Sequence, residues 1–196
     1  MDYASLLNEI YGLTKRPDLT TETTSAVKAA TLQMHGMDYF AKDIYESGIS
    51  FATSDYFQSL DYKLLLPRWR APKYFRKYDA VGLTPGKILS EIPIEKVLDG
   101  YKIDRQDIWY LAGGVIQIRS ATKEQYYLFG AYLFPSVDSS NYISWIADEY
   151  PYAIVYKAVS MVYKMIGLMD EAKNNEDLSK EFQAEIIKHN IVATGS

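Results

Sequence analysis

The apolar residues of the first 48 positions repeat with the period of an α-helix. A short amphipathic helix is expected over residues 2–13, and a polar run that leads to Pro17 ends it. A longer, half-buried helix is expected over residues 20–47 and ends at Gly48. Along it, apolar side chains recur at steps of three, four and seven positions: Val27, Ala30, Met34, Met37, Ala41 and Ile44.

Beyond Gly48 the apolar period shortens towards two, which is typical of β-strands. Gly113 and Gly114 lie between two strand-like pieces and suit a tight hairpin turn. The central part therefore predicts a small antiparallel sheet inserted between helices. Prolines and glycines divide it into short pieces, with one helical turn at 94–98 and strands at 49–53, 56–66, 108–111, 115–119 and 126–134.

Helical periodicity returns at Pro151, a residue well placed in a first helical turn. The helix that follows is apolar on most faces, so we expect it to be buried, with room for a neighbouring subunit to cover part of it. A mostly charged helix is expected over residues 177–189, and residues 190–196 show no helical pattern.

The predicted fold class is α+β and mainly helical. We expect a bundle of about four helices with a small inserted antiparallel β domain and an extended C-terminal tail. The expected parts are the N-terminal helices of the bundle (1–48), the β-rich insert (49–143), the C-terminal helices (144–189) and the extended tail (190–196).

Composition excludes several classes of function. The 196 residues carry a formal net charge of −4, so the whole molecule is not expected to bind nucleic acid through its charge. There is no cysteine, which excludes disulfides, zinc–thiolate sites and thiol catalysis. Polar residues follow Met1 and no uncharged apolar run approaches about 20 residues, so we expect no secretory signal and no membrane span. The 18 tyrosines favour protein interfaces.

The sequence contains no motif typical of catalysis, metal binding or cofactor binding. HExxH, P-loop, GxGxxG and GxSxG patterns are absent. His35 is expected at a helix edge with a local hydrogen bond, and His189 near a helix C-terminus, where a cation is favourable. We therefore predict no enzymatic activity, no cofactor and no metal site. The acidic residues considered lack a partner motif or metal-ligand spacing: Asp38, Asp43, Asp104, Asp107 and Asp138.

A basic and aromatic segment at residues 63–77 is the most distinctive local feature. Three interpretations of it remain open. The cations pair with an acidic surface of a neighbouring protein, or they contact DNA on which Trp69, Tyr74 and Phe75 stack, or the segment is a solvated surface whose aromatics pack locally. Arginine favours the first, because a guanidinium binds a carboxylate through two bonds. No acid separates its cations: Lys63, Arg68, Arg70, Lys73, Arg76 and Lys77.

Four blocks of the sequence, taken in order, carry a family resemblance. The first is Arg16-Pro17-Asp18-Leu19 and a long helix with Lys28, Ala30-Thr31, His35 and Asp43. The second is Leu66 to Arg70 with Tyr74 and Arg76, and the third is the strand Gly114 to Arg119 followed by Tyr126 to Pro135. The fourth runs from Trp145-Ile146 through Asp148 to Pro151 and into the last helices. Together these blocks resemble the head-to-tail adaptor (connector or neck) proteins of tailed bacteriophages.

The resemblance implies a structural virion protein at the head–tail junction, made in the cytoplasm of the bacterial host. Adaptors of this family form a ring, typically of twelve copies, below the portal. The ring extends the DNA channel and offers a docking surface for the tail. The implied partners are the portal protein, adjacent adaptor subunits and tail nozzle, tail-tube or tail-fibre proteins. Genomic DNA passes through the lumen without specific binding, and no membrane is involved.

The resemblance also implies two sets of contact residues in this chain. The C-terminal segment of such adaptors commonly clamps the portal, which here would be Asn190, Ile191, Val192, Ala193, Thr194, Gly195 and Ser196. The subunit or tail interface would include Arg68, Trp69, Arg70, Lys73, Tyr74 and Arg76. Two alternatives stay open: another neck or tail-completion protein of a tailed phage, and a nucleic-acid-binding module that uses residues 63–77. Steep loss of affinity with salt would distinguish the nucleic-acid module.

Overall fold

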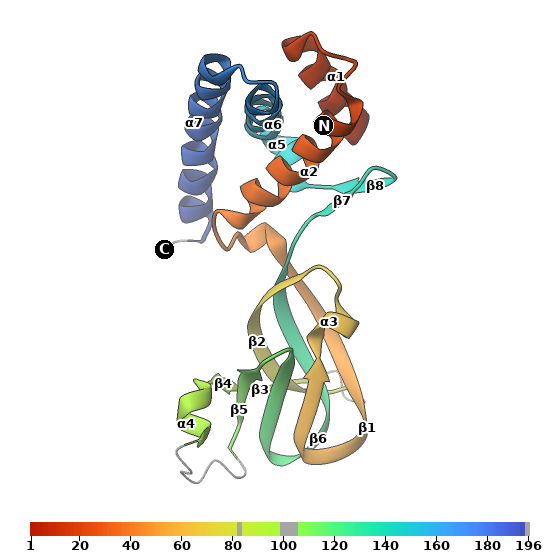
Figure 1. Ribbon diagram of the computed structural model, residues 1–196. Helices are drawn as coiled ribbons and strands as arrows, with labels where there is room; N and C mark the ends of the chain where they lie inside the picture. Colours follow the sequence, from red (N-terminus) through yellow and green to blue (C-terminus); the bar gives the residue numbers. More distant parts are fainter. Residues whose placement is uncertain (82–83, 99–105, 195–196) are drawn as a thin grey trace. The chain divides into compact units, whose positions relative to one another are not determined.

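The computed structural model describes residues 1–81, 84–98 and 106–194, and the chain divides into two compact units (Figure 1). The helical unit comprises Met1–Asp43 and Phe134–Ser196. The β unit is the single segment between them, Ile44–Leu133. The β unit is therefore an insertion into the helical unit.

The helical unit is built around helix α6 (Pro151–Met165), whose apolar faces meet three other helices. These are α1 (Tyr3–Thr14), α2 (Thr20–Gly36) and α7 (Met169–Thr194). Ile154 and Val159 of α6 are fully buried in this core, as the apolar sequence pattern predicts. Smaller elements complete the unit: the 3₁₀ turn η1 (Ala41–Asp43), the hairpin of β7 (Ser136–Asp138) and β8 (Asn141–Ile143), and the short helix α5 (Trp145–Glu149).

An ion-pair cluster ties α6 to α7. The carboxylate of Glu176 accepts hydrogen bonds from Lys157, at 3.1 Å, and from Lys164. The hydrogen bond from Lys164, followed by that from Lys157, lowers the pKa of Glu176 to about 2. The cluster therefore stabilises the folded state only while Glu176 is ionised.

This cluster predicts a loss of stability in acid. The contribution of Glu176 is fully present above its ordinary pKa of 4.5 and is lost as the pH falls from there towards 2. We expect a loss of about 1–2 kcal/mol over that range, since the carboxylate is partly exposed and partly screened. Urea unfolding at pH 6 and pH 3 should show this loss in the natural chain and a smaller one in Glu176→Gln. Glu185→Gln, on the exposed side of α7, is the control. Equal losses in all three chains would contradict the assignment.

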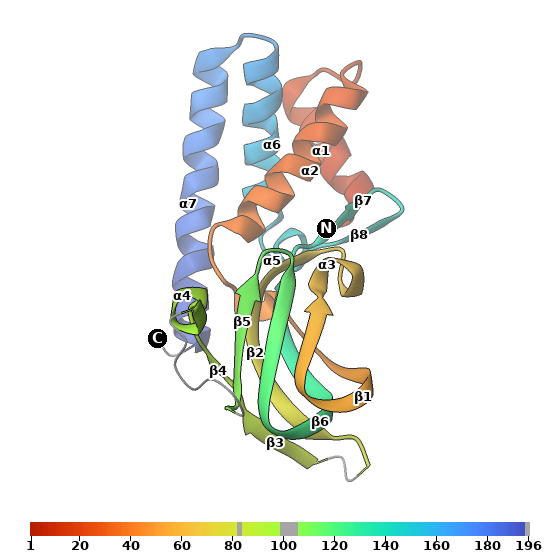
Figure 2. The ribbon, with the colours of Figure 1, turned by 60° about the horizontal axis from the view of Figure 1, so that its bottom comes forward.

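The β unit is built on a long, bent ribbon of two antiparallel strands, β1 (Ile44–Asp61) and β6 (Val115–Leu133) (Figure 2). Their register runs from Ile44 opposite Tyr132 to Ser50 opposite Tyr126, shifts, and resumes from Phe57 opposite Arg119 to Asp61 opposite Val115. The register shifts mark β-bulges, which bend the ribbon. Both strands therefore take part in two successive stretches of the same sheet.

Each half of the ribbon carries its own further strands. The C-terminal half of β6 pairs with β2 (Trp69–Asp79), which pairs with β3 (Thr84–Ile88). The N-terminal half of β6 pairs with β5 (Ile108–Ala112), and β4 (Ser90–Glu91) lies parallel to β5. Two short helices, α3 (Tyr62–Leu65) and α4 (Ile94–Leu98), lie within the connections. The core contains Phe75, Trp109, Ile116, Tyr127 and Phe129, all at most 1% exposed.

The structure corrects the predicted fold class. The chain is α+β with 46% helix and 36% strand, and its six-stranded sheet is not a small insert in a mainly helical four-helix bundle. The helix expected over 20–47 ends at Gly36, and β1 begins at Ile44. The expected boundaries of the insert were 49–143, whereas the β unit is Ile44–Leu133.

The C-terminal segment is also different from the expectation. Residues 190–194 continue α7 as a helix, so the prediction of an extended tail is wrong for them, and Gly195 and Ser196 lie outside the described residues. A hydrogen bond from Asn190 Nδ2 to Asp38 Oδ2, at 3.1 Å, holds this last part of α7 against the rest of the helical unit. Within the described ranges, no helix is long and apolar enough to cross a bilayer.

Candidate functional site

A buried hydrogen-bond network joins three elements of the helical unit. His35, which is 1% exposed at the end of α2, contacts Asp43 Oδ1 through Nδ1 at 2.8 Å and Ser144 Oγ through Nε2 at 2.9 Å. Trp145 Nε1 donates to the same carboxylate oxygen at 2.8 Å. Since a carboxylate only accepts, His35 Nδ1 donates to Asp43. The sequence placed His35 at a helix edge with a local bond, but its partners are 8 and 109 positions away.

The serine, imidazole and carboxylate of this network follow the order of a catalytic triad. Ser144, however, is 4% exposed, and its hydroxyl accepts the N–H of Ala147, so it acts as the N-cap of α5. A nucleophile must reach its substrate, and Ser144 is almost wholly buried. The geometry therefore indicates a structural clamp. The absence of enzymatic activity stays a prediction.

The clamp holds Trp145 at the wall of a cavity of about 160 Å³ in the helical unit. Its ring packs edge-on against Phe40, with centroids 5.2 Å apart. Lys42 Nζ lies 5.0 Å from the centre of the Trp145 ring and binds Glu149 at 2.5 Å. The cavity thus has an aromatic wall and a charged rim. It is lined by Phe40, Ala41, Lys42, Trp145, Glu149, Tyr150, Ile186, His189 and Asn190.

The end of α7 forms one side of this cavity. Ile186 is buried, while His189 bonds through Nδ1 to the hydroxyl of Tyr150. Asn190, the first residue of the expected portal-binding segment, is held by Asp38, and Ile191 is 49% exposed. The expected segment therefore begins as a helix fixed beside a cavity. Of its other members, Val192, Ala193 and Thr194 continue the helical backbone, and Gly195 and Ser196 lie outside the described residues.

The basic and aromatic segment lies in the β unit, mostly in β2. The ring of Trp69 stacks with that of Tyr62, at 5.1 Å between centroids, and with that of Phe129, at 6.0 Å, so it belongs to the edge of the β core. The ring of Tyr74 lies directly over Gly130, where a Cβ would come within 2.5 Å of Tyr74 Cε1. These aromatic rings pack locally, as the third interpretation of the segment predicts.

The cations of the same segment differ in their surroundings. Arg68 and Lys73 are exposed, and Arg70 and Arg76 are half-buried. Lys73 Nζ lies 5.5 Å from the centre of the Tyr132 ring. Lys77 is drawn into the fold, where it pairs with Asp107 at 2.7 Å. The structure therefore brings Arg68, Trp69, Arg70, Lys73, Tyr74 and Arg76 onto one strand and its lead-in, but does not present all of them to solvent.

Asp107 has a structural role that the sequence did not indicate. The N–H of Ala121 and the ammonium groups of Lys77 and Lys87 stabilise its carboxylate against the cost of partial burial, and the pKa of Asp107 is lowered as a result. No group of three potential metal ligands occurs among residues 1–81, 84–98 and 106–194, and Asp104 lies outside them.

The sequence matches no protein-family model, and no curated protein matches it. The resemblance to head-to-tail adaptors therefore stays a prediction from the four sequence blocks.

Proposed function

We propose that this chain is a structural virion protein, a head-to-tail adaptor of a tailed bacteriophage. In this proposal a ring of copies lies below the portal, extends the DNA channel and gives the tail a docking surface. The partners are the portal protein, the adjacent subunits and a tail component.

The observation that carries the proposal is that the resembling blocks contact one another in pairs, the first with the fourth in the helical unit and the second with the third in the β unit. His35 and Asp43 of the first block share one buried network with Trp145 of the fourth. The second and third blocks pair as strands, with Tyr74 opposite Gly130 and Trp69 opposite Leu133. Each unit therefore contains two of the blocks in direct contact, which is the arrangement that an architecture shared with the adaptors requires.

A nucleic-acid-binding module is the second candidate, and the packing of the aromatics argues against it. Sequence-tolerant binders of single strands use exposed rings on which bases stack. Here the ring of Trp69 stacks with Tyr62 and with Phe129, and Phe75 is 0% exposed. The exposed cations of the segment are therefore better suited to pair with carboxylates of a neighbouring protein than to bind nucleic acid.

The proposal is tested by mixing the purified chain with isolated portal rings, and separately with DNA-filled heads that lack tails. Mass photometry and negative-stain microscopy should show one added ring per portal. Single-stranded and duplex DNA are titrated in parallel at 50 and 200 mM salt. Failure to bind the portal, together with DNA affinity that falls steeply with salt, would replace the proposal with the nucleic-acid module.

A chain that ends at Asn190 separates the adaptor from other neck or tail-completion proteins. This shortened chain keeps the hydrogen bond from Asn190 to Asp38, and it keeps the residues of α7 that line the cavity. If the segment after Asn190 clamps the portal, this chain should remain folded and bind portal rings at least tenfold more weakly. Unchanged binding would assign the portal contact to another surface.

A further inference from the structure

The β unit contains a four-stranded antiparallel stretch with two open edges. Its strand order is β1–β6–β2–β3, with the first seven residues of β1, Ile44–Ser50, at one edge and β3 at the other. Among the described residues no further strand pairs with either edge. An open edge presents backbone N–H and C=O groups that can pair with another chain.

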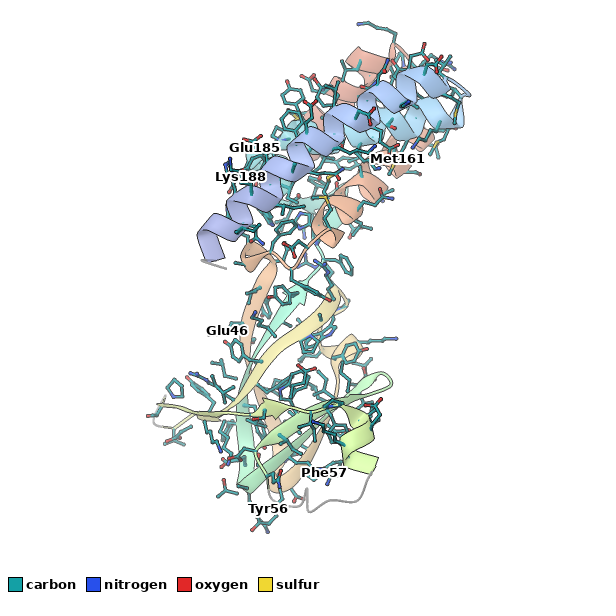
Figure 3. The ribbon with its side chains drawn as sticks, turned by 90° about the vertical axis from the view of Figure 1, so that its left-hand side faces the viewer. Glu46, Tyr56, Phe57, Met161, Glu185 and Lys188 are labelled. Atoms are coloured by element: carbon teal, nitrogen blue, oxygen red, sulfur yellow. The ribbon has the colours of Figure 1, made fainter. Side chains whose placement is uncertain are left out.

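The β1 edge lacks most features that keep edge strands apart. Natural edges are commonly short, or protected by lysine and proline. β1 is 18 residues long, and Ile44–Asp61 contains no Lys, Arg or Pro. Its bulges lie beyond Ser50, so the Ile44–Ser50 stretch keeps a regular ladder with β6. Figure 3 labels Glu46 on this stretch and Tyr56 and Phe57 at the distant bend.

The two edges carry opposite charge. The open stretch of β1, Ile44–Ser50, has one charged residue, Glu46. The other edge strand, β3, also has one, Lys87, whose side chain is exposed and lies 3.3 Å from Asp107. Contact between two β1 edges would bring like charges together, whereas contact between β1 and β3 brings opposite charges together.

Strand direction leads to the same pairing. The four strands alternate in direction, so β1 and β3 run antiparallel to each other. A second copy in the same orientation would place its β1 antiparallel to the β3 of the first, and the alternation would continue from copy to copy. We propose that β1 of one copy of this chain pairs with β3 of the next, which gives a head-to-tail contact between subunits. This inference rests on the proposed function only for the ring that such contacts would close.

Pro85 limits where the new ladder forms. It has no N–H to donate, so the pairing is expected along Gly86, Lys87 and Ile88. All three are exposed, and Ile88 is 51% exposed. Ile44 and Tyr45, at the start of β1, are exposed, and the same contact would bury part of their apolar surface.

The absence of cysteine from the sequence makes cross-linking a clean test. Cysteine replaces Glu46 or Ser50 on β1 and Ile88 on β3. The two positions on β1 test two possible registers of the ladder between β1 and β3. Strand neighbours with Cβ atoms within about 4.5 Å form a disulfide under mild oxidation. Glu46→Cys with Ile88→Cys in one chain, or Ser50→Cys with Ile88→Cys, should give a ladder of covalent multimers. A mixture of the two single variants should stop at dimers that contain one of each.

The controls separate the alternatives. Ala184→Cys on exposed α7, combined with Ile88→Cys, should form no covalent multimers. Efficient dimers of Glu46→Cys or Ser50→Cys alone would show that β1 meets β1, and the proposal would be wrong. So would the lack of any cross-link, both in solution and on portal rings, in variants with native circular dichroism. Rings on the portal without cross-links would support the adaptor function and contradict the strand pairing. Cross-links without portal binding would support the strand pairing and contradict the adaptor function.

Discussion

Replacement of Asp43 by alanine is expected to lower the free energy of unfolding of the helical unit by about 3–5 kcal/mol. Its side chain is 3% exposed, and one oxygen receives bonds from both His35 and Trp145. Alanine would remove the acceptor of the buried His35 and of the half-buried Trp145, and would break the bonds that join three elements. Chemical unfolding followed by circular dichroism at 222 nm measures the loss.

Two matched variants make this result specific. Asp43→Asn keeps an acceptor oxygen at the same place and should lose about half as much or less. Asp138→Ala removes an exposed carboxylate of the β7–β8 hairpin and should change stability by less than about 0.5 kcal/mol. An Asp43→Ala protein as stable as Asp138→Ala would show that the network does not hold the unit together.

Replacement of Phe129 by alanine is expected to cost the β unit about 3–5 kcal/mol. The ring is 1% exposed and stacks on Phe75 and Trp69, each at 6.0 Å, with Tyr45 edge-on at 6.5 Å. Its removal would leave a cavity at the centre of the sheet and free one face of Trp69. Hydrogen exchange should therefore show faster opening of β2 and β6.

The change at Phe129 also tests the link between the core and the basic and aromatic segment. Phe129→Leu fills much of the space and should cost clearly less. Phe129→Ala should shift the fluorescence of Trp69, measured in a chain with Trp109 and Trp145 replaced by Phe, towards that of an exposed indole. An unchanged Trp69 signal would mean that Tyr62 alone holds the ring, and the dependence of this surface on the core would be refuted.

Helices with a strong local signal could be predicted from the sequence. Residues 2–13 and the helix from Pro151 correspond to α1 and α6, because a capping residue or proline and a continuous apolar stripe mark each start. The glycine turn at Gly113 is confirmed as well, with a φ of 65° between β5 and β6. These features depend only on nearby residues, which is why the pattern was sufficient.

The extent of the sheet could not be predicted in the same way. Residues 115–119 and 126–134 were expected as two strands, and the polar run from Thr122 to Gln125 lies between them. In the structure the run is the bend of one long strand, β6, and β1 bends beside it. Bends of this kind are specified by pairing between positions distant in sequence, and an apolar period does not record that pairing.

The candidate site was predicted in part for the same reason. The sequence singled out residues 63–77 as one local segment, but it did not show that Trp69 and Tyr74 pack on Phe129 and Gly130. The cavity beside α7 was missed altogether, because Phe40, Trp145 and Ile186 are far apart in the chain and share no period. Sites made by convergence of distant segments leave no local signal.

The pairing of Ile44 with Tyr132 has a consequence for the history of the chain. The β unit begins and ends on two adjacent strands, so its entry and exit lie side by side. A segment with this arrangement can be gained, lost or exchanged in one genetic event, since the host unit needs only to accept two neighbouring chain ends. The helical unit and the inserted sheet are thus free to change in sequence at different rates.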